Sequence, residues 1–292
     1  MSFRVAEADG DDRWHRLYAR KLEVEAVQAF ELFRRNGIEP VLIKGWAAAR
    51  NYPAHAPRFY SDIDLAVSAE EFDSAQTLLA SKEASRIGID LHRELRHLDS
   101  RPWRLIFESS QLIDLDGCAI RIPSPEDHLR ILAVHWLNDG GESKDRLWDV
   151  YYALAAHAGT FDWDYCLDGL STVRRGWIIA AVGLANKYLG LPIDGIPFAA
   201  EARDLPRWLI AAVEREWSRG VLHRSLHTCL NDPGEFIRQL RKRIPPNAIQ
   251  ATIECEGDIR AGMRLPFQIR CMMKRSIPSI RGVAETIRSK AR

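Results

Sequence analysis

Two carboxylates placed two residues apart are the feature of this chain best suited to chemistry. Asp62 and Asp64 lie in a strand-like, otherwise apolar run, residues 61–67. Side chains alternate along a β-strand, so we expect both carboxylates on one face. They repel each other unless a cation lies between them, and a divalent metal that also holds a phosphate is the common solution. A solvated strand edge is the plain alternative, but the pair favours phosphoryl or nucleotidyl transfer.

A third acid strengthens this hypothesis. Asp90 lies in a candidate strand, residues 86–95, on the same face as His92 and Glu94. Three carboxylates from two strands can hold two Mg²⁺ or Mn²⁺ ions about 4 Å apart, which activate the attacking oxygen and stabilise charge on phosphorus. Simple alternation of a sheet strand would also produce this pattern.

Residues suited to phosphate binding precede the acid pair. Gly45 lets the backbone approach a ligand closely, and the N–H groups of the turn that begins at Trp46 favour an anion, with Lys44 supplying charge. Arg58 and Ser61 flank the acids, where a guanidinium would pair with a phosphate or, equally well, with an aspartate. A surface lysine at a strand-to-helix turn is the alternative for Lys44.

The elements that must position these residues follow from hydrophobic periodicity. We expect a helix over 11–36, stopped by Gly37, and a helix that Ser68 caps and that runs to about Ser81. Strands are expected over 38–43, 61–67 and 86–95, with further strand or hairpin material over 103–107 and 111–122. The later helices are expected over 124–138, 143–157, 171–189 and 201–218, with one or two more between 233 and 290.

This order of elements predicts an α+β fold, in which a small mixed sheet flanked by helices is followed by a helical half. We expect three parts: a catalytic α/β unit (1–123), a helical domain (124–235) and a basic helical tail (236–292).

Three segments give the chain a recognisable signature: VLIKGWAAARNYP (41–53), RFYSDIDLAV (58–67) and IDLH (89–92). Together they resemble the bacterial family of uncharacterised nucleotidyltransferases, within the polymerase-β-like nucleotidyltransferase superfamily. The resemblance covers about 20–195 and extends to SPED (124–127) and RLWD (146–149). It implies a nucleotidyltransferase fold, Mg²⁺, a nucleoside triphosphate (NTP) such as ATP as donor, and transfer of a nucleoside monophosphate (NMP) to an acceptor.

The resemblance also suggests roles for individual residues. It implies that metal binding and catalysis fall to Asp62, Asp64 and Asp90. Nucleotide binding would fall to Lys44, Gly45, Trp46, Arg58 and Ser61. His92 and His135 are candidates for the acceptor pocket, although a packed core histidine is an equal alternative for His135.

Two departures from the family pattern bear on function. The usual Gly-Ser phosphate turn reads Gly45-Trp46, so backbone N–H groups and Lys44 must replace a serine hydroxyl. The segment between Asp64 and Asp90 is short and leaves little room for a hairpin beside the nucleotide base. A toxin-like enzyme that modifies tRNA or protein, and a degenerate non-catalytic binding protein, are the alternatives. The acceptor stays open between small molecule, sugar, peptide and RNA.

Charge is distributed unevenly along the chain. Residues 238–292 contain 13 basic and 4 acidic residues, a local charge of +9, which leaves −8 for residues 1–237. Such a tail fits its own acidic body, a nucleic acid or a membrane surface. Pro266 and Pro278 interrupt a single amphipathic helix and favour a tail that is docked on the body or mobile. Five scattered cysteines, no signal-peptide core and no long apolar run predict a cytoplasmic protein without a transmembrane segment.

Overall fold

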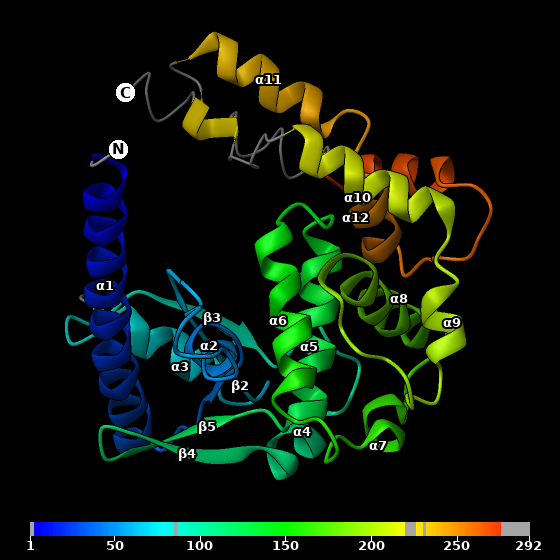
Figure 1. The fold of residues 1–292 in the computed structure, drawn as a ribbon. Helices are drawn as coiled ribbons and strands as arrows, with labels where there is room; N and C mark the ends of the chain where they lie inside the picture. The colour runs from blue at the N-terminus through cyan, green and yellow to red at the C-terminus, as the bar shows by residue number, and fades with distance from the viewer. Residues whose placement is uncertain (1–2, 85–86, 220–225, 230–231, 276–292) are drawn as a thin grey trace. The chain divides into compact units, whose positions relative to one another are not determined.

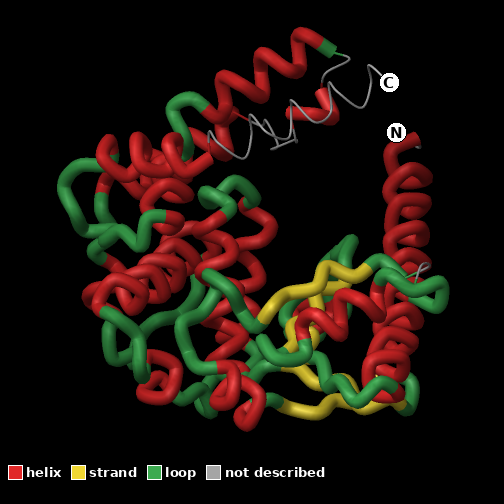
Figure 2. The backbone as a smooth tube through the Cα atoms, turned by 180° about the vertical axis from the view of Figure 1, so that it is seen from behind, coloured by secondary structure: helices red, strands yellow, loops and turns green. Residues whose placement is uncertain are grey.

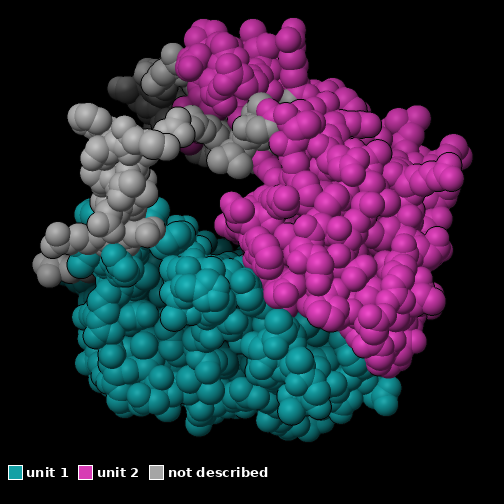
Figure 3. All heavy atoms as spheres, viewed as in Figure 1, with its two compact units in different colours: residues 1–132, 152–169 teal, residues 133–151, 170–292 magenta. Residues whose placement is uncertain are grey.

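The computed structural model describes residues 3–84, 87–219, 226–229 and 232–275. The chain forms two compact units, residues 1–132 with 152–169 and residues 133–151 with 170–292, coloured teal and magenta in Figure 3. The predicted catalytic stretch, 1–123, falls entirely in the first unit. Within the described part of the chain, no helix is both long and apolar enough to cross a membrane.

A small mixed sheet organises the first unit (Figures 1 and 2). Its strands are β1 (Val41–Leu42), β2 (Ile63–Val67) and β3 (Ile89–Arg93), in that order across the sheet. The β1 strand is antiparallel to β2, whereas β2 and β3 are parallel and are connected through α3 (Phe72–Leu79). The fold is therefore α+β with small sheets flanked by helices, as predicted, although β1 and β3 are shorter than expected.

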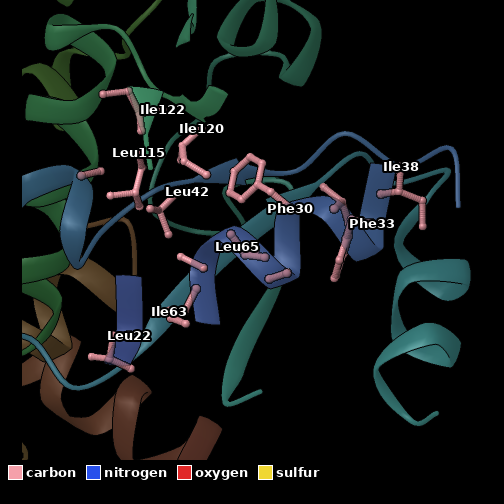
Figure 4. Close-up of a cluster of buried hydrophobic side chains, with 14 of the residues drawn as sticks. Leu22, Phe30, Phe33, Ile38, Leu42, Ile63, Leu65, Leu115, Ile120 and Ile122 are labelled. Atoms are coloured by element: carbon pink, nitrogen blue, oxygen red, sulfur yellow. The ribbon is translucent and has the colours of Figure 1, made fainter. Parts of the chain in front are cut away.

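The long helix α1 (Phe3–Arg35) packs Leu22, Phe30 and Phe33 into the core on one face of this sheet (Figure 4). Ile63, Leu65 and Val67 alternate along β2 and join the α1 side chains in one cluster. Ala66 points the other way and packs into a second cluster. Asn36 and Gly37 follow α1, and Gly37 has a φ of 74°, so the predicted glycine stop is confirmed.

The predicted hairpin is present, but the segment before it is not extended. The strands β4 (Gln111–Leu115) and β5 (Cys118–Ile122) pair around Asp116 and Gly117, which both have positive φ. The prediction of strand structure over 103–107 is wrong, because these residues form α4 (Trp103–Ser109). Ile106 is fully buried, and Trp103 and Phe107 pack against the same cluster one helical turn apart.

Helices dominate the rest of the chain. They are α5 (Pro125–Asn138), α6 (Lys144–Ala155), α7 (Trp163–Leu167), α8 (Thr172–Leu189), α9 (Ala199–Arg203), α10 (Arg207–Arg219), the 3₁₀ turn η1 (Leu226–Cys229), α11 (Pro233–Arg243) and α12 (Ala248–Glu254). Residues 265–275 are also helical. The single helix predicted over 201–218 is wrong: it is two helices, interrupted where Pro206 offers no N–H to continue the first. The predicted tail extends beyond the described residues, since 276–292 lie outside them.

Candidate active site

The pairing of β2 with β3 brings two of the predicted acids together. In this parallel pair Asp64 is the register partner of Asp90, and Ala66 is the partner of His92. Partners in adjacent strands project to the same face of a sheet, so Asp64, Asp90 and His92 gather at one place. The acids are 26 positions apart in sequence, and strand register alone makes them neighbours.

Asp64 is the buried centre of the group, with only 2% of its surface exposed. One of its oxygens, Oδ1, lies 2.7 Å from Lys44 Nζ and 3.0 Å from His92 Nε2. Burial acts to raise the pKa of Asp64, but the hydrogen bonds and charges of His92 and Lys44 outweigh it and hold the pKa below its usual value. Asp64 is therefore an anion at neutral pH.

His92 links the buried acid to an exposed one. Its Nε2 lies 3.2 Å from Asp90 Oδ2, and the Asp90 side chain is 59% exposed. Ligand atoms of Asp64, Asp90 and His92 all lie within 4.8 Å of one another, close enough to share one metal ion. His92 Nδ1 is buried and has no hydrogen-bond partner among the described residues. The group thus extends from a buried carboxylate to one that solvent reaches.

The Lys44-Gly45 turn lies directly beside this group. Gly45 has φ 60°, and a Cβ atom there would lie 3.0 Å from the carbonyl oxygen of Asp62, so the turn requires glycine. The Arg58 guanidinium donates to the carbonyl oxygen of Gly45 at 3.3 Å. Trp46 begins the short helix α2 (Trp46–Ala49) and packs partly against the core. The Arg50 guanidinium lies over its ring. Lys44, Gly45 and Arg58 are therefore brought together, as their predicted shared role requires.

Asp62 and Ser61 are placed differently from the expectation. The strand begins at Ile63 and not at residue 61, so Asp62 precedes it and is exposed. Asp62 is not among the residues whose ligand atoms cluster within 4.8 Å in the described part of the chain. Ser61 is also exposed, and its carbonyl oxygen accepts from the Tyr18 hydroxyl at 3.3 Å. Their assigned roles in metal and nucleotide binding stay predictions.

His135 belongs to the second unit. There its Nε2 lies 3.0 Å from the Arg146 guanidinium and 3.5 Å from Asp139 Oδ2. Its proposed place in an acceptor pocket stays a prediction.

Sequence reasoning did not foresee the direct contact between Lys44 and Asp64. It assigned Lys44 to phosphate and His92 to the acceptor, yet both contact the same carboxylate oxygen. A signal existed. The strands containing residues 41–42 and 63–67 are antiparallel neighbours, so the residue that follows the first lies beside the start of the second. Antiparallel pairing of those two strands would have predicted the contact.

The small mixed sheet, the strand-to-helix turn at Gly45 and the acids on paired strands are together consistent with an enzyme of the nucleotidyltransferase class. The chain belongs to the family described as uncharacterised nucleotidyltransferase, whose model matches residues 7–190. This confirms the resemblance found in the sequence. No curated protein and no solved structure matches the chain.

Proposed function

We propose that this protein transfers NMP from an NTP to an acceptor in a reaction that depends on Mg²⁺. The observation that carries the proposal is the register of β2 and β3, which pairs Asp64 with Asp90 beside the Lys44-Gly45 turn. Membership of the nucleotidyltransferase family supports transfer of a nucleotide in general. The requirement for metal and the roles of single residues are the finer part of the proposal.

The donor atoms fit a hard divalent cation. Asp64 and Asp90 offer carboxylate oxygens, which both Mg²⁺ and Mn²⁺ prefer. Asp64 is already held as an anion by two basic side chains, so a cation would meet a charged ligand there. Asp64 and Asp90, with Asp62 as the predicted third acid, would hold the metal. When bound, the metal supplies Lewis-acid stabilisation of the charge that develops on the phosphate oxygens.

The protein's own residues supply the remaining functions. Lys44, after moving from Asp64 to the donor, would neutralise its phosphates while the Gly45 turn presents backbone N–H groups. Arg58 steadies that turn through the Gly45 carbonyl. Asp90 is exposed, so it can take the proton of the acceptor hydroxyl, whose oxygen bonds to the α-phosphorus of the NTP as the bond to pyrophosphate breaks. His92 holds Asp64 and Asp90 in position through one ring nitrogen.

The direct test is to incubate the protein with each α-labelled NTP, with Mg²⁺ or Mn²⁺, and with fractionated small molecules, protein and RNA. Label should move to one fraction in a metal-dependent way, and chelation should stop it. The matched variant is Asp64→Asn, which keeps the size of the side chain and removes its charge. Transfer of label that is equal with the variant, or equal after chelation, would contradict the proposed site.

A further inference from the structure

The helix formed by residues 265–275 carries an apolar stripe on its solvent-facing side. Leu265, Ile269, Met272 and Met273 are 62%, 45%, 42% and 66% exposed. Their spacing of four, three and one places them within an arc of about 100° on a helix of 3.6 residues per turn. Met263, just before the helix, is 74% exposed. A helix of a globular protein normally turns such a stripe inward.

The opposite face of the same helix already has its partners. Cys271 is fully buried in a cluster with Ala251 and Cys255, and Phe267 packs against that cluster. The ring of Phe267 leaves no room for a Cβ at Gly257, where the nearest ring atom would be 2.5 Å away. Hydrogen bonds add to the contact: Gln268 donates to the Pro246 carbonyl oxygen at 2.7 Å, and Arg275 pairs with Glu254. The inner face of the helix therefore holds it against the rest of the second unit, and the outer stripe is not part of that core.

The stripe is part of a wider pattern in the second unit. Among the described residues of that unit, every large apolar side chain that is exposed lies between residues 237 and 273. Positive charge accompanies these side chains. From residue 260 to the C-terminus the sequence has nine basic residues and one acidic residue. On the helix itself, Arg270 is exposed and lies next to the apolar arc, whereas Lys274 donates to the Glu254 carbonyl oxygen at 3.1 Å on the inner side. Pro266 lies in the first turn of the helix, where proline is tolerated, so it does not interrupt this amphipathic segment.

We propose that the outer face of helix 265–275 is a docking surface for an anionic phospholipid bilayer. Methionine, leucine and isoleucine would enter the boundary between headgroups and acyl chains, while Arg270 meets a lipid phosphate. RNA would satisfy the charges but offers nothing to four exposed aliphatic side chains. A second copy of the chain would bring the same excess of positive charge to the contact.

Vesicle sedimentation with the full-length chain tests the proposal. The protein should sediment with vesicles of phosphatidylcholine and phosphatidylglycerol, and at least about tenfold less with phosphatidylcholine alone. The variant that combines Ile269→Ser and Met273→Ser should lose about tenfold in partitioning, because two side chains no longer enter the bilayer. Arg270→Glu should lose at least about tenfold, and the loss should shrink at high salt.

The matched control is Leu112→Ser on β4, since Leu112 is 54% exposed and belongs to the other unit. It should bind vesicles as the unaltered chain does. Circular dichroism and thermal unfolding should show that all variants are folded. Equal vesicle binding by the apolar variant would overturn the proposal. Three other results would also overturn it. One is that the protein fails to bind anionic vesicles, and another is that a detergent-free wash that contains tRNA releases it from them. The third is a dimer in solution that the apolar variant dissociates.

Discussion

Two clusters of buried charge in the first unit differ in how far solvent reaches them. The acidic site consists of Lys44, Asp64, Asp90 and His92. The second, here called the Asp127 network, surrounds a carboxylate with no exposed surface. Its oxygens accept from Arg101 at 2.6 Å, Ser109 at 2.8 Å, Ser124 at 3.1 Å and Tyr165 at 3.3 Å. Solvent does not reach the Asp127 carboxylate, whereas the acidic site opens to solvent through Asp90.

The pKa shifts of the two buried acids have opposite directions. Burial raises the pKa of Asp127, and Arg101 and Ser109 only partly offset the effect. Burial also acts to raise the pKa of Asp64, but His92 and Lys44 outweigh it and the net pKa is lowered. A structural carboxylate can thus be satisfied chiefly by hydroxyl groups and one ion pair. Asp64 is kept ionised by two basic groups, His92 and Lys44, and it lies beside the exposed Asp90, where a cation could bind.

Burial of a charged residue therefore does not by itself mark a functional site. Asp127 joins α5 to α4 and α7 through ligands that all come from the protein. Asp64 shares its surroundings with an acid that has 59% of its side chain in solvent. A second carboxylate that is exposed to solvent is expected in a cluster whose negative charge a ligand would balance.

The largest expected effect is on catalysis at the acidic site. Asp64→Asn should reduce NMP transfer at least about a thousandfold, because the site loses a charged metal ligand. Far-ultraviolet circular dichroism should remain that of the unaltered protein. Label transfer under Mg²⁺ measures the effect. Activity within tenfold of the unaltered enzyme would remove Asp64 from the catalytic machinery.

The Asp127 network should respond in stability instead. Asp127→Ala leaves Arg101 buried without its carboxylate and should lower the free energy of unfolding by about 3 kcal/mol. Urea titration measures the loss. At a temperature where the variant is still folded, its turnover should stay within a few-fold of the unaltered enzyme. A large fall in turnover without a fall in stability would contradict the division between the two clusters.

Lys44 tests how far the acidic site extends toward the donor. Lys44→Ala should lower kcat/KM for the NTP about 30-fold, because one charged contact to phosphate is worth about 2 kcal/mol. The control is Lys21→Ala on α1, where the lysine is 60% exposed and pairs with Glu25 one helical turn away. That control should leave kcat/KM unchanged. Equal values for the two variants would mean that Lys44 serves Asp64 alone.

The lowered pKa of Asp64 gives the smallest effect, a dependence of stability on pH. The ionised form of Asp64 contributes stability at pH values above its pKa in the unfolded chain, near 3.8. This contribution is lost as the pH falls through the lower pKa that Asp64 has in the folded protein. Asp64→Asn should therefore be about 2 kcal/mol less stable than the unaltered chain at pH 7, and the difference should shrink below about pH 4. Urea titrations at both pH values measure this. A difference that is constant with pH would contradict the ionised state assigned to Asp64.

Much of the fold and the family were predictable from the sequence, for identifiable reasons. Asn36-Gly37, Asp116-Gly117 and Ser124-Pro125 are local signals, and each correctly marks a helix end, a hairpin turn or a helix start. Residues 103–107 were mispredicted because a short apolar run does not distinguish a strand from a buried helix.

The site was predictable only in part. Asp90 and His92 were placed on one face by strand alternation, and they do meet. The start of β2 at Ile63, which leaves Asp62 outside the strand, depends on where its pairing partners end. The contact of Lys44 with Asp64 depends on strand pairing across 20 residues, and no local pattern encodes it.

The parallel pairing of β2 with β3 has a consequence for how this protein can change. Register, and not the intervening chain, sets the approach of Asp64 to Asp90. Lengthening a surface connection costs little free energy, since the entropy of loop closure grows slowly with its length. Lys82 and Glu83, which are exposed after α3, therefore form a natural place to insert a foreign segment, such as a reporter or an added specificity loop, without separating the two acids.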